Sequence, residues 1–202
     1  MSSTSKVLLA TTNKGKIKEF LALLTPLNVE ILTPRDLGIE LDVDETGDTY
    51  AANAALKAEA YCQQAAMPVL ADDSGLEVDA LGGAPGVRSA RYAPKQGATD
   101  ADRRQYLLER LQSYPRPWNA RFRCVIAVAV PGGEMRFSEG TCEGEIIPQE
   151  RGGGGFGYDP VFLVAGRTQT MAELNFEEKN QISHRARATQ AALLILNEIL
   201  KV

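Results

Sequence analysis

Hydrophobic positions in the first half of the chain switch repeatedly between short continuous runs and the helical period. A short apolar run followed by turn residues is typical of a buried strand, and apolar side chains at a spacing of three to four are typical of an amphipathic helix. Strand and helix alternate in this way at least twice before residue 75, which is the pattern of an α/β fold. The predicted elements are strands over residues 6–11, 28–33 and 69–71, a helix from residue 16 and an alanine-rich helix over residues 49–66.

The second half of the chain predicts a hairpin of two longer strands. A loop rich in glycine and proline at residues 81–92 precedes a charged amphipathic helix over residues 100–112. The runs at 121–130 and 134–147 are joined by a Pro-Gly-Gly turn, and such a short connection requires antiparallel strands. We therefore expect a mixed sheet, closed by a final amphipathic helix over residues 180–200.

Length and composition fit one globular domain. The chain has 202 residues, of which 44% are hydrophobic, so it can bury a sizeable core, and we expect a single domain with two lobes and a flexible tail at residues 1–5. The net charge of -4 is spread along the chain, which argues against binding to nucleic acid or to an anionic membrane.

The three cysteines form no CxxC pair, so neither a disulfide framework nor a zinc site is indicated. No segment looks like a signal peptide or a membrane span, and a cytoplasmic location is expected.

The turn between the first strand and the first helix could bind phosphate. Backbone N–H groups at a helix N-terminus attract anions, and this turn carries the sequence Thr11-Thr12-Asn13-Lys14-Gly15-Lys16. It is not a Walker A loop, because Ile17 stands where that motif has Ser or Thr. Turns with glycine and lysine are also common in ordinary α/β proteins, so this signal alone leaves both interpretations open.

Two adjacent carboxylates, Asp72 and Asp73, follow the third predicted strand. Carboxylates at the exit of a buried strand repel each other, and a divalent cation would relieve that repulsion. Mg²⁺ prefers one or two carboxylates together with phosphate oxygens and water, which fits this pair with Asp42, Asp44 or Glu45 from the acidic loop. The alternative is a solvated turn formed with the Ser-Gly that follows.

The single histidine limits the possible chemistry. His184 has no second histidine with which to form a zinc centre and no evident partners for an acyl-transfer triad, so a local structural role is the first interpretation. Lys179, Arg185 and Arg187 nevertheless form a basic group around it. The glycine run at 152–155 likewise predicts either a simple bend or a close approach to a ligand beside aromatic residues.

Taken together, five motifs resemble the ITPase-like (Ham1-like) family of pyrophosphatases for non-standard purine nucleoside triphosphates. They are TTNKGK, DETG, ADDSGLEVDALGGAPGVRSARY, GGFGYDPVF and ISHRARA, and they occur in the order typical of that family. One departure is Thr12, where the family often has glycine. The resemblance implies hydrolysis of ITP, dITP and XTP to the monophosphate and pyrophosphate, with Mg²⁺ as the cofactor.

The resemblance also implies a role for each candidate residue. Asp73 would accept the proton of the attacking water and, with Glu45, would bind Mg²⁺. The substrate would be bound by Thr11, Thr12, Asn13, Lys14, Gly15, Lys16, Lys57 and Ser74, and around the nucleoside by Phe156, Gly157, Tyr158, Asp159, Lys179, His184 and Arg185.

The family fold is an elongated mixed β-sheet flanked by helices, with two lobes and a substrate groove between them, normally in a homodimer. Two alternatives stay open at the level of sequence. One is a pyrophosphatase for modified pyrimidine triphosphates, and the other is a non-catalytic nucleotide- or RNA-binding module, against which the absence of a basic, aromatic-rich face counts.

Overall fold

Strands of both directions form the sheet, as the mixed pattern predicts. The computed structural model describes residues 5–200, and within them six strands lie in the order β2-β1-β3-β4-β5-β6. β1 pairs in parallel with both β2 and β3, whereas β5 and β6 are antiparallel. The strands are β1 (Lys6–Leu9), β2 (Glu30–Leu32), β3 (Val69–Val78), β4 (Trp118–Ala129), β5 (Arg136–Ile146) and β6 (Phe162–Val164).

Contacts along the chain divide it into two compact units. The first unit consists of the segments Met1–Asp73, Cys124–Gly140 and Arg185–Val202. The second unit consists of Ser74–Arg123 and Thr141–His184. Each of β3, β4 and β5 contributes residues to both units. The tail expected at residues 1–5 lies, except for Ser5, outside the described residues.

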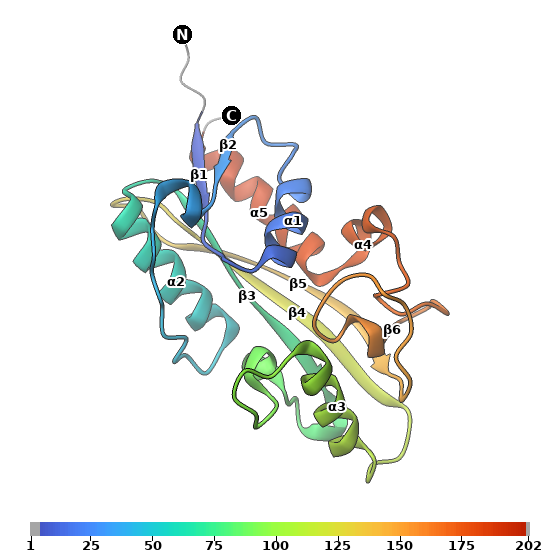
Figure 1. Ribbon diagram of the computed structural model, residues 1–202. Coiled ribbons are helices and arrows are strands. Elements are labelled where there is room, and N and C mark those ends of the chain that lie inside the picture. The colour runs from blue at the N-terminus through green and yellow to red at the C-terminus, as the bar shows by residue number, and fades with distance from the viewer. Residues whose placement is uncertain (1–4, 201–202) are drawn as a thin grey trace. The chain divides into compact units, whose positions relative to one another are not determined.

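In the first unit the sheet is covered by helices on both faces (Figure 1). Successive side chains of a strand point to opposite faces. Val7 and Leu9 therefore pack with α1 and α5, while Leu8 between them packs with α2. The helices are α1 (Lys14–Leu23), α2 (Tyr50–Ala65) and α5 (His184–Leu200).

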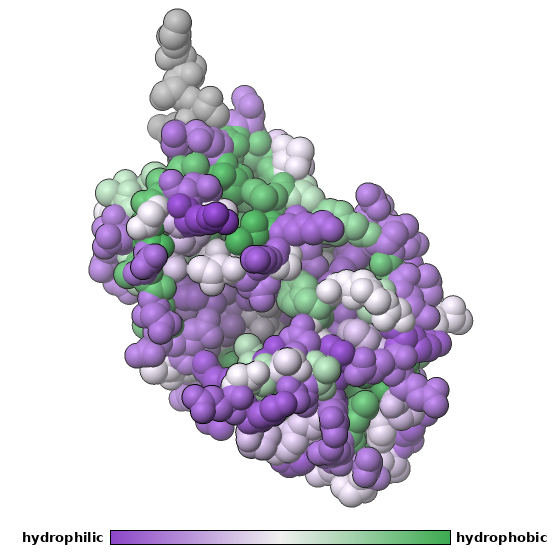
Figure 2. All heavy atoms as spheres, in the orientation of Figure 1, coloured by the Kyte–Doolittle hydropathy of each residue, from purple (hydrophilic) through white to green (hydrophobic). Residues whose placement is uncertain are grey.

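The second unit has its own hydrophobic core. Leu107 and Leu111 of α3 (Asp100–Leu111) are fully buried in it, together with Phe162 of β6. The outer surface over α3 is mostly hydrophilic, whereas apolar side chains reach the surface over β2 and α1 in the first unit (Figure 2). The second unit also contains α4 (Phe176–Ile182) and the short 3-10 helices Asp79–Leu81, Gly86–Arg91 and Asp159–Val161.

Two expectations from the sequence were wrong. β3 does not stop at Ala71 but continues to Val78, so Asp72 and Asp73 lie inside a strand and not in a turn. The final helix is interrupted at Ser183, which has an extended backbone and ends α4 before α5 begins at His184. Within residues 5–200, no helix has the length and apolar content needed to cross a membrane.

Candidate functional site

The predicted phosphate turn is a helix N-terminus that faces solvent. Asn13 is the N-cap of α1, and its side-chain oxygen accepts a hydrogen bond from the backbone N–H of Lys16 at 3.0 Å. Thr12, Asn13 and Lys14 are exposed, which leaves this end of α1 open to an anion. Thr11 and Gly15, the other residues of the predicted turn, are half-buried.

Asp72 lies on the α1 and α5 side of β3 among positive charges. Its Oδ2 is 2.9 Å from Lys16 Nζ and 3.7 Å from a guanidinium nitrogen of Arg185, and the side chain is 1% exposed. Burial alone would raise the pKa of Asp72, but Lys16, Arg185 and Lys57 together hold it well below its usual value. Asp72 is therefore a permanent carboxylate that orients Lys16 from behind the turn.

Asp73 points to the opposite face of β3, towards α2. Its Oδ2 accepts a hydrogen bond from the side-chain amide of Asn53 at 3.0 Å. Burial raises the pKa of Asp73 above its usual value, Glu45 adds to the rise, and Lys57 and Asn53 offset only part of it. A carboxylate with a raised pKa is a better proton acceptor than an ordinary aspartate.

Lys57 connects β3 with the acidic loop. Its ammonium group is 2.6 Å from Glu45 Oε1 and 2.5 Å from the backbone carbonyl oxygen of Asp72. Burial works to lower the pKa of Lys57, but the charges of Asp72, Glu45 and Asp73 outweigh it and raise the pKa. Lys57 is thus a fixed cation between two predicted metal ligands.

The residues of this cluster fit a divalent cation that is completed by substrate. Glu45 and Asp73 both lie near Lys57, and their negative charges repel each other. A divalent cation would relieve this repulsion. Within residues 5–200, no three His, Cys, Asp or Glu side chains are grouped so as to hold a metal by themselves. Two carboxylates suit Mg²⁺, which takes its remaining ligands from phosphate and water.

The predicted nucleoside residues, except Arg185, belong to the second unit. Asp159 is buried, and its Oδ2 accepts hydrogen bonds from the Phe156 N–H at 2.9 Å and from Lys179 Nζ at 2.5 Å. The Lys179 ammonium also lies 5.0 Å from the centre of the Phe156 ring. The half-buried Phe156 is the aromatic platform of this loop, because Tyr158 is buried and its hydroxyl donates to the Ser89 carbonyl at 2.9 Å.

The structure divides the ISHRARA motif between the two units. His184 is buried and stacks on Phe122, with ring centroids 4.8 Å apart. Arg185 belongs to the first unit, where Glu19 and Asp72 face its guanidinium group. Ser74, the remaining predicted substrate contact, is half-buried in β3 directly after Asp73.

Sequence reasoning missed Asn53 and Glu19, two buried polar residues of the first unit. The Asn53 side-chain oxygen accepts a hydrogen bond from the Gly47 N–H at 2.8 Å, and its side-chain NH₂ donates one to Asp73. A signal for it existed, because Asn53 and Lys57 are four positions apart and so share one face of an otherwise alanine-rich helix. Glu19 gave no such signal, since its partner Arg185 is far away in the sequence.

Comparisons with known proteins identify the relatives of this chain. Residues 7–194 match the Ham1 family. The chain is 45% identical over 193 residues to a dITP/XTP pyrophosphatase of Bacillus licheniformis, covering 96% of this chain and 98% of the relative. It is 52% identical over 184 residues to a dITP/XTP pyrophosphatase of Geobacillus kaustophilus, covering 91% and 90%.

Solved structures show the same fold. A HAM1 protein from Coxiella burnetii superposes with a TM-score of 0.88 at 41% identity, covering 96% of this chain and all of that one. The Ham1 protein of Staphylococcus aureus superposes with a TM-score of 0.85 at 39% identity, covering 96% and 99%.

Proposed function

The chain belongs to the Ham1 family, and from that membership we propose that it hydrolyses noncanonical purine nucleoside triphosphates such as ITP, dITP and XTP to the monophosphate and pyrophosphate. Such an activity removes faulty precursors from the nucleotide pool. The names of the relatives favour this substrate class over modified pyrimidines, and they favour an enzyme over a binding module.

The observation that carries the proposal is the arrangement in the first unit. The N-terminus of α1 is open to solvent, and Lys16 in its first turn pairs with Asp72 of β3. The next residue of β3 is Asp73, a carboxylate whose pKa is raised. Backbone N–H groups and Lys16 would bind the triphosphate, and the β and γ phosphates would leave as one unit. Asp73 would take the proton from the attacking water.

Glu45 and Asp73 are the residues that would hold Mg²⁺. When bound, the ion supplies positive charge that neutralises the leaving pyrophosphate. Lys57 keeps its proton beside both carboxylates and so limits their mutual repulsion before substrate arrives. We assign the nucleoside to Phe156, Asp159 and Lys179 of the second unit, where an aromatic face and buried charges occur together.

A homodimer in the cytoplasm is the state that fits this proposal, because nucleotide pools are cytoplasmic and dimers are the commonest assembly of soluble enzymes. Sedimentation at several protein concentrations would test the dimer.

The activity itself is tested by a panel of ITP, dITP, XTP, dATP, dGTP and a modified pyrimidine triphosphate, each with and without Mg²⁺. Phosphorus NMR of the products should show pyrophosphate as the first product, from the noncanonical purines and only with the metal. Stepwise release of orthophosphate, or equal turnover of all nucleotides, would contradict the proposal.

A further inference from the structure

Beside the aromatic platform, both backbone polar groups of one residue, Gly157, are hydrogen-bonded to side chains of one helix. The Gly157 N–H donates to Asp100 Oδ2 at 2.7 Å, and the Gly157 carbonyl oxygen accepts from Arg104 at 2.8 Å. Asp100 and Arg104 are four positions apart on α3, so they share one face of that helix. The two bonds are charge-assisted, the stronger class of hydrogen bond.

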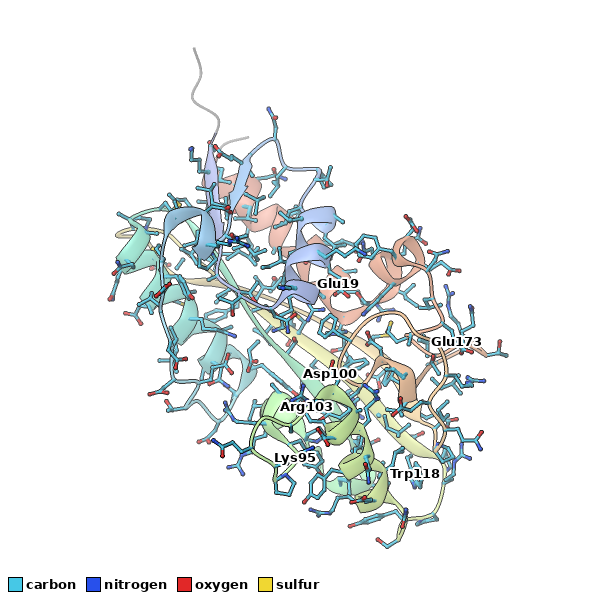
Figure 3. All side chains as sticks on the ribbon, in the orientation of Figure 1. Glu19, Lys95, Asp100, Arg103, Trp118 and Glu173 are labelled. Carbon is cyan, nitrogen blue, oxygen red and sulfur yellow. The ribbon has the colours of Figure 1, made fainter. Side chains whose placement is uncertain are left out.

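The side chains of Asp100 and Arg104 are themselves held in place by ion pairs. Arg104 forms a fork with Glu150, with two N–O distances of 2.9 Å. Asp100 is paired with Arg103 one turn further along α3, and both side chains lie at the start of that helix (Figure 3). Burial works to raise the pKa of Asp100, but the Gly157 N–H and Arg103 bring it below its usual value, so the carboxylate stays charged.

The two hydrogen bonds to Gly157 hold its backbone in a left-handed conformation. Gly157 has φ +61°, a left-handed conformation, and Gly155 on the other side of Phe156 has φ +70°. Glycine enters this region freely but also leaves it freely, so outside contacts must select it. From the other side, Asp159 binds the Phe156 N–H. Phe156 thus lies between two anchored points, one on α3 and one on Asp159.

We propose that Asp100 and Arg104 are positioning residues that aim Phe156 at the purine base. This inference rests on the proposed function and on the assignment of the base to Phe156. An aromatic ring stacks well on a base only within a narrow range of orientations, so a misplaced ring weakens binding of the nucleoside. The phosphates bind elsewhere on the chain, and their affinity should not depend on α3.

The test compares Asp100→Ala with Asp102→Ala at the same helix end. The Asp102 carboxylate accepts hydrogen bonds from the Thr99 N–H and hydroxyl in the capping box of α3 but makes no bond to Gly157, so its loss weakens the helix start without releasing the loop. For Asp100→Ala we expect KM for dITP to rise about tenfold, the loss typical of one charge-assisted hydrogen bond, with little change in kcat. Competitive inhibition by inorganic tripolyphosphate, which has no base, should keep its inhibition constant.

Arg104→Gln provides a second variant should Asp100→Ala fail to fold, and we expect the same split between dITP and tripolyphosphate. Equal KM values in Asp100→Ala and Asp102→Ala would overturn the inference, as would a parallel rise in the inhibition constant of tripolyphosphate. In both cases the proposed function would stand, because the wild type still hydrolyses dITP. A wild type that does not hydrolyse dITP would overturn both proposals.

Discussion

Glu19 and Arg185 are 166 positions apart in the chain, yet a carboxylate oxygen of Glu19 lies 2.5 Å from a guanidinium nitrogen of Arg185 in the interior of the first unit. The Arg185 guanidinium also lies 5.6 Å from the centre of the Phe20 ring. Burial works to lower the pKa of Arg185, and the charges of Glu19 and Asp72 reverse that effect. The pair fixes the start of α5 to α1 and places a positive charge behind Asp72.

Arg185→Ala should therefore cost stability before it alters chemistry. Removing one partner of a buried ion pair leaves the other charges uncompensated, which typically costs about 3–5 kcal/mol of the free energy of unfolding. Urea unfolding monitored by circular dichroism would measure the loss. Arg187→Ala is the matched control, because Arg187 is exposed on the same helix and its loss should change stability by less than about 0.5 kcal/mol. Equal effects of the two substitutions would contradict this account of Arg185.

Asp72→Asn and Asp73→Asn should have different effects on stability. The fold favours the charged form of Asp72 and disfavours the charged form of Asp73. Asp72→Asn should therefore lower the melting temperature, whereas Asp73→Asn should leave it unchanged or raise it. Asp73→Asn should still reduce kcat by about 10²–10⁴-fold, the usual loss for a general base. A folded Asp73→Asn enzyme with near-normal turnover would move the proton acceptor elsewhere.

Local patterns predicted most of the elements. Period and turn residues located α2 and α3 to within about one residue at each end, because their apolar faces and capping residues are contiguous in the sequence. The roles of the phosphate turn and of Glu45 stay predictions. Asp72 and Asp73 were placed at the exit of a strand that ends at Ala71, because the Ser-Gly pair that follows them usually ends a strand but lies here within β3.

What depends on distant partners could not be read from the sequence. Two contacts join segments that only the folded chain brings together. One is the ion pair of Glu19 with Arg185, and the other is the pair of hydrogen bonds of Gly157 with Asp100 and Arg104. The same holds for Asp73, whose raised pKa follows from burial and from Glu45, not from its neighbour in the sequence.

The glycine run should differ sharply in its tolerance of alanine. A Cβ at Gly155 would lie 1.9 Å from Asp159 Oδ2, and the residue has φ +70°. At Gly153 a Cβ would meet no atom within 4 Å. We expect Gly155→Ala to displace Asp159 from the Phe156 N–H and to raise KM for dITP severalfold or more, whereas Gly153→Ala should match the wild type. Equal KM values for the two variants would show that the Asp159 anchor is not needed.

Acid should remove the stabilising contribution of Asp100. The pKa of Asp100 is lower in the folded protein than in the unfolded chain, so its contribution is full at neutral pH and is lost as pH falls through the folded pKa. The difference in unfolding free energy between wild type and Asp100→Asn should be constant above about pH 5 and should shrink below about pH 4. Urea unfolding at a series of pH values would check this. A difference that stays constant down to pH 3 would mean that the Asp100 charge does not contribute.

Base selectivity should depend on the second unit, and affinity for phosphate on the first. ITP and XTP carry a carbonyl at position 6 where ATP carries an amino group, so a donor that binds the carbonyl would meet another donor in ATP. Sites built on such hydrogen bonds discriminate by up to about 10⁴–10⁵-fold, and apolar pockets by only about 10²-fold.

Lys179 is the donor best placed beside Phe156, whereas the Arg185 guanidinium faces Glu19 and Asp72. Lys179→Met should therefore lower kcat/KM for dITP far more than for dATP, whereas Lys16→Met should lower both alike. The ratio of kcat/KM for the two nucleotides, measured on both variants and on His184→Ala, decides the matter. A ratio unchanged in both Lys179→Met and His184→Ala would show that neither residue reads position 6 of the base.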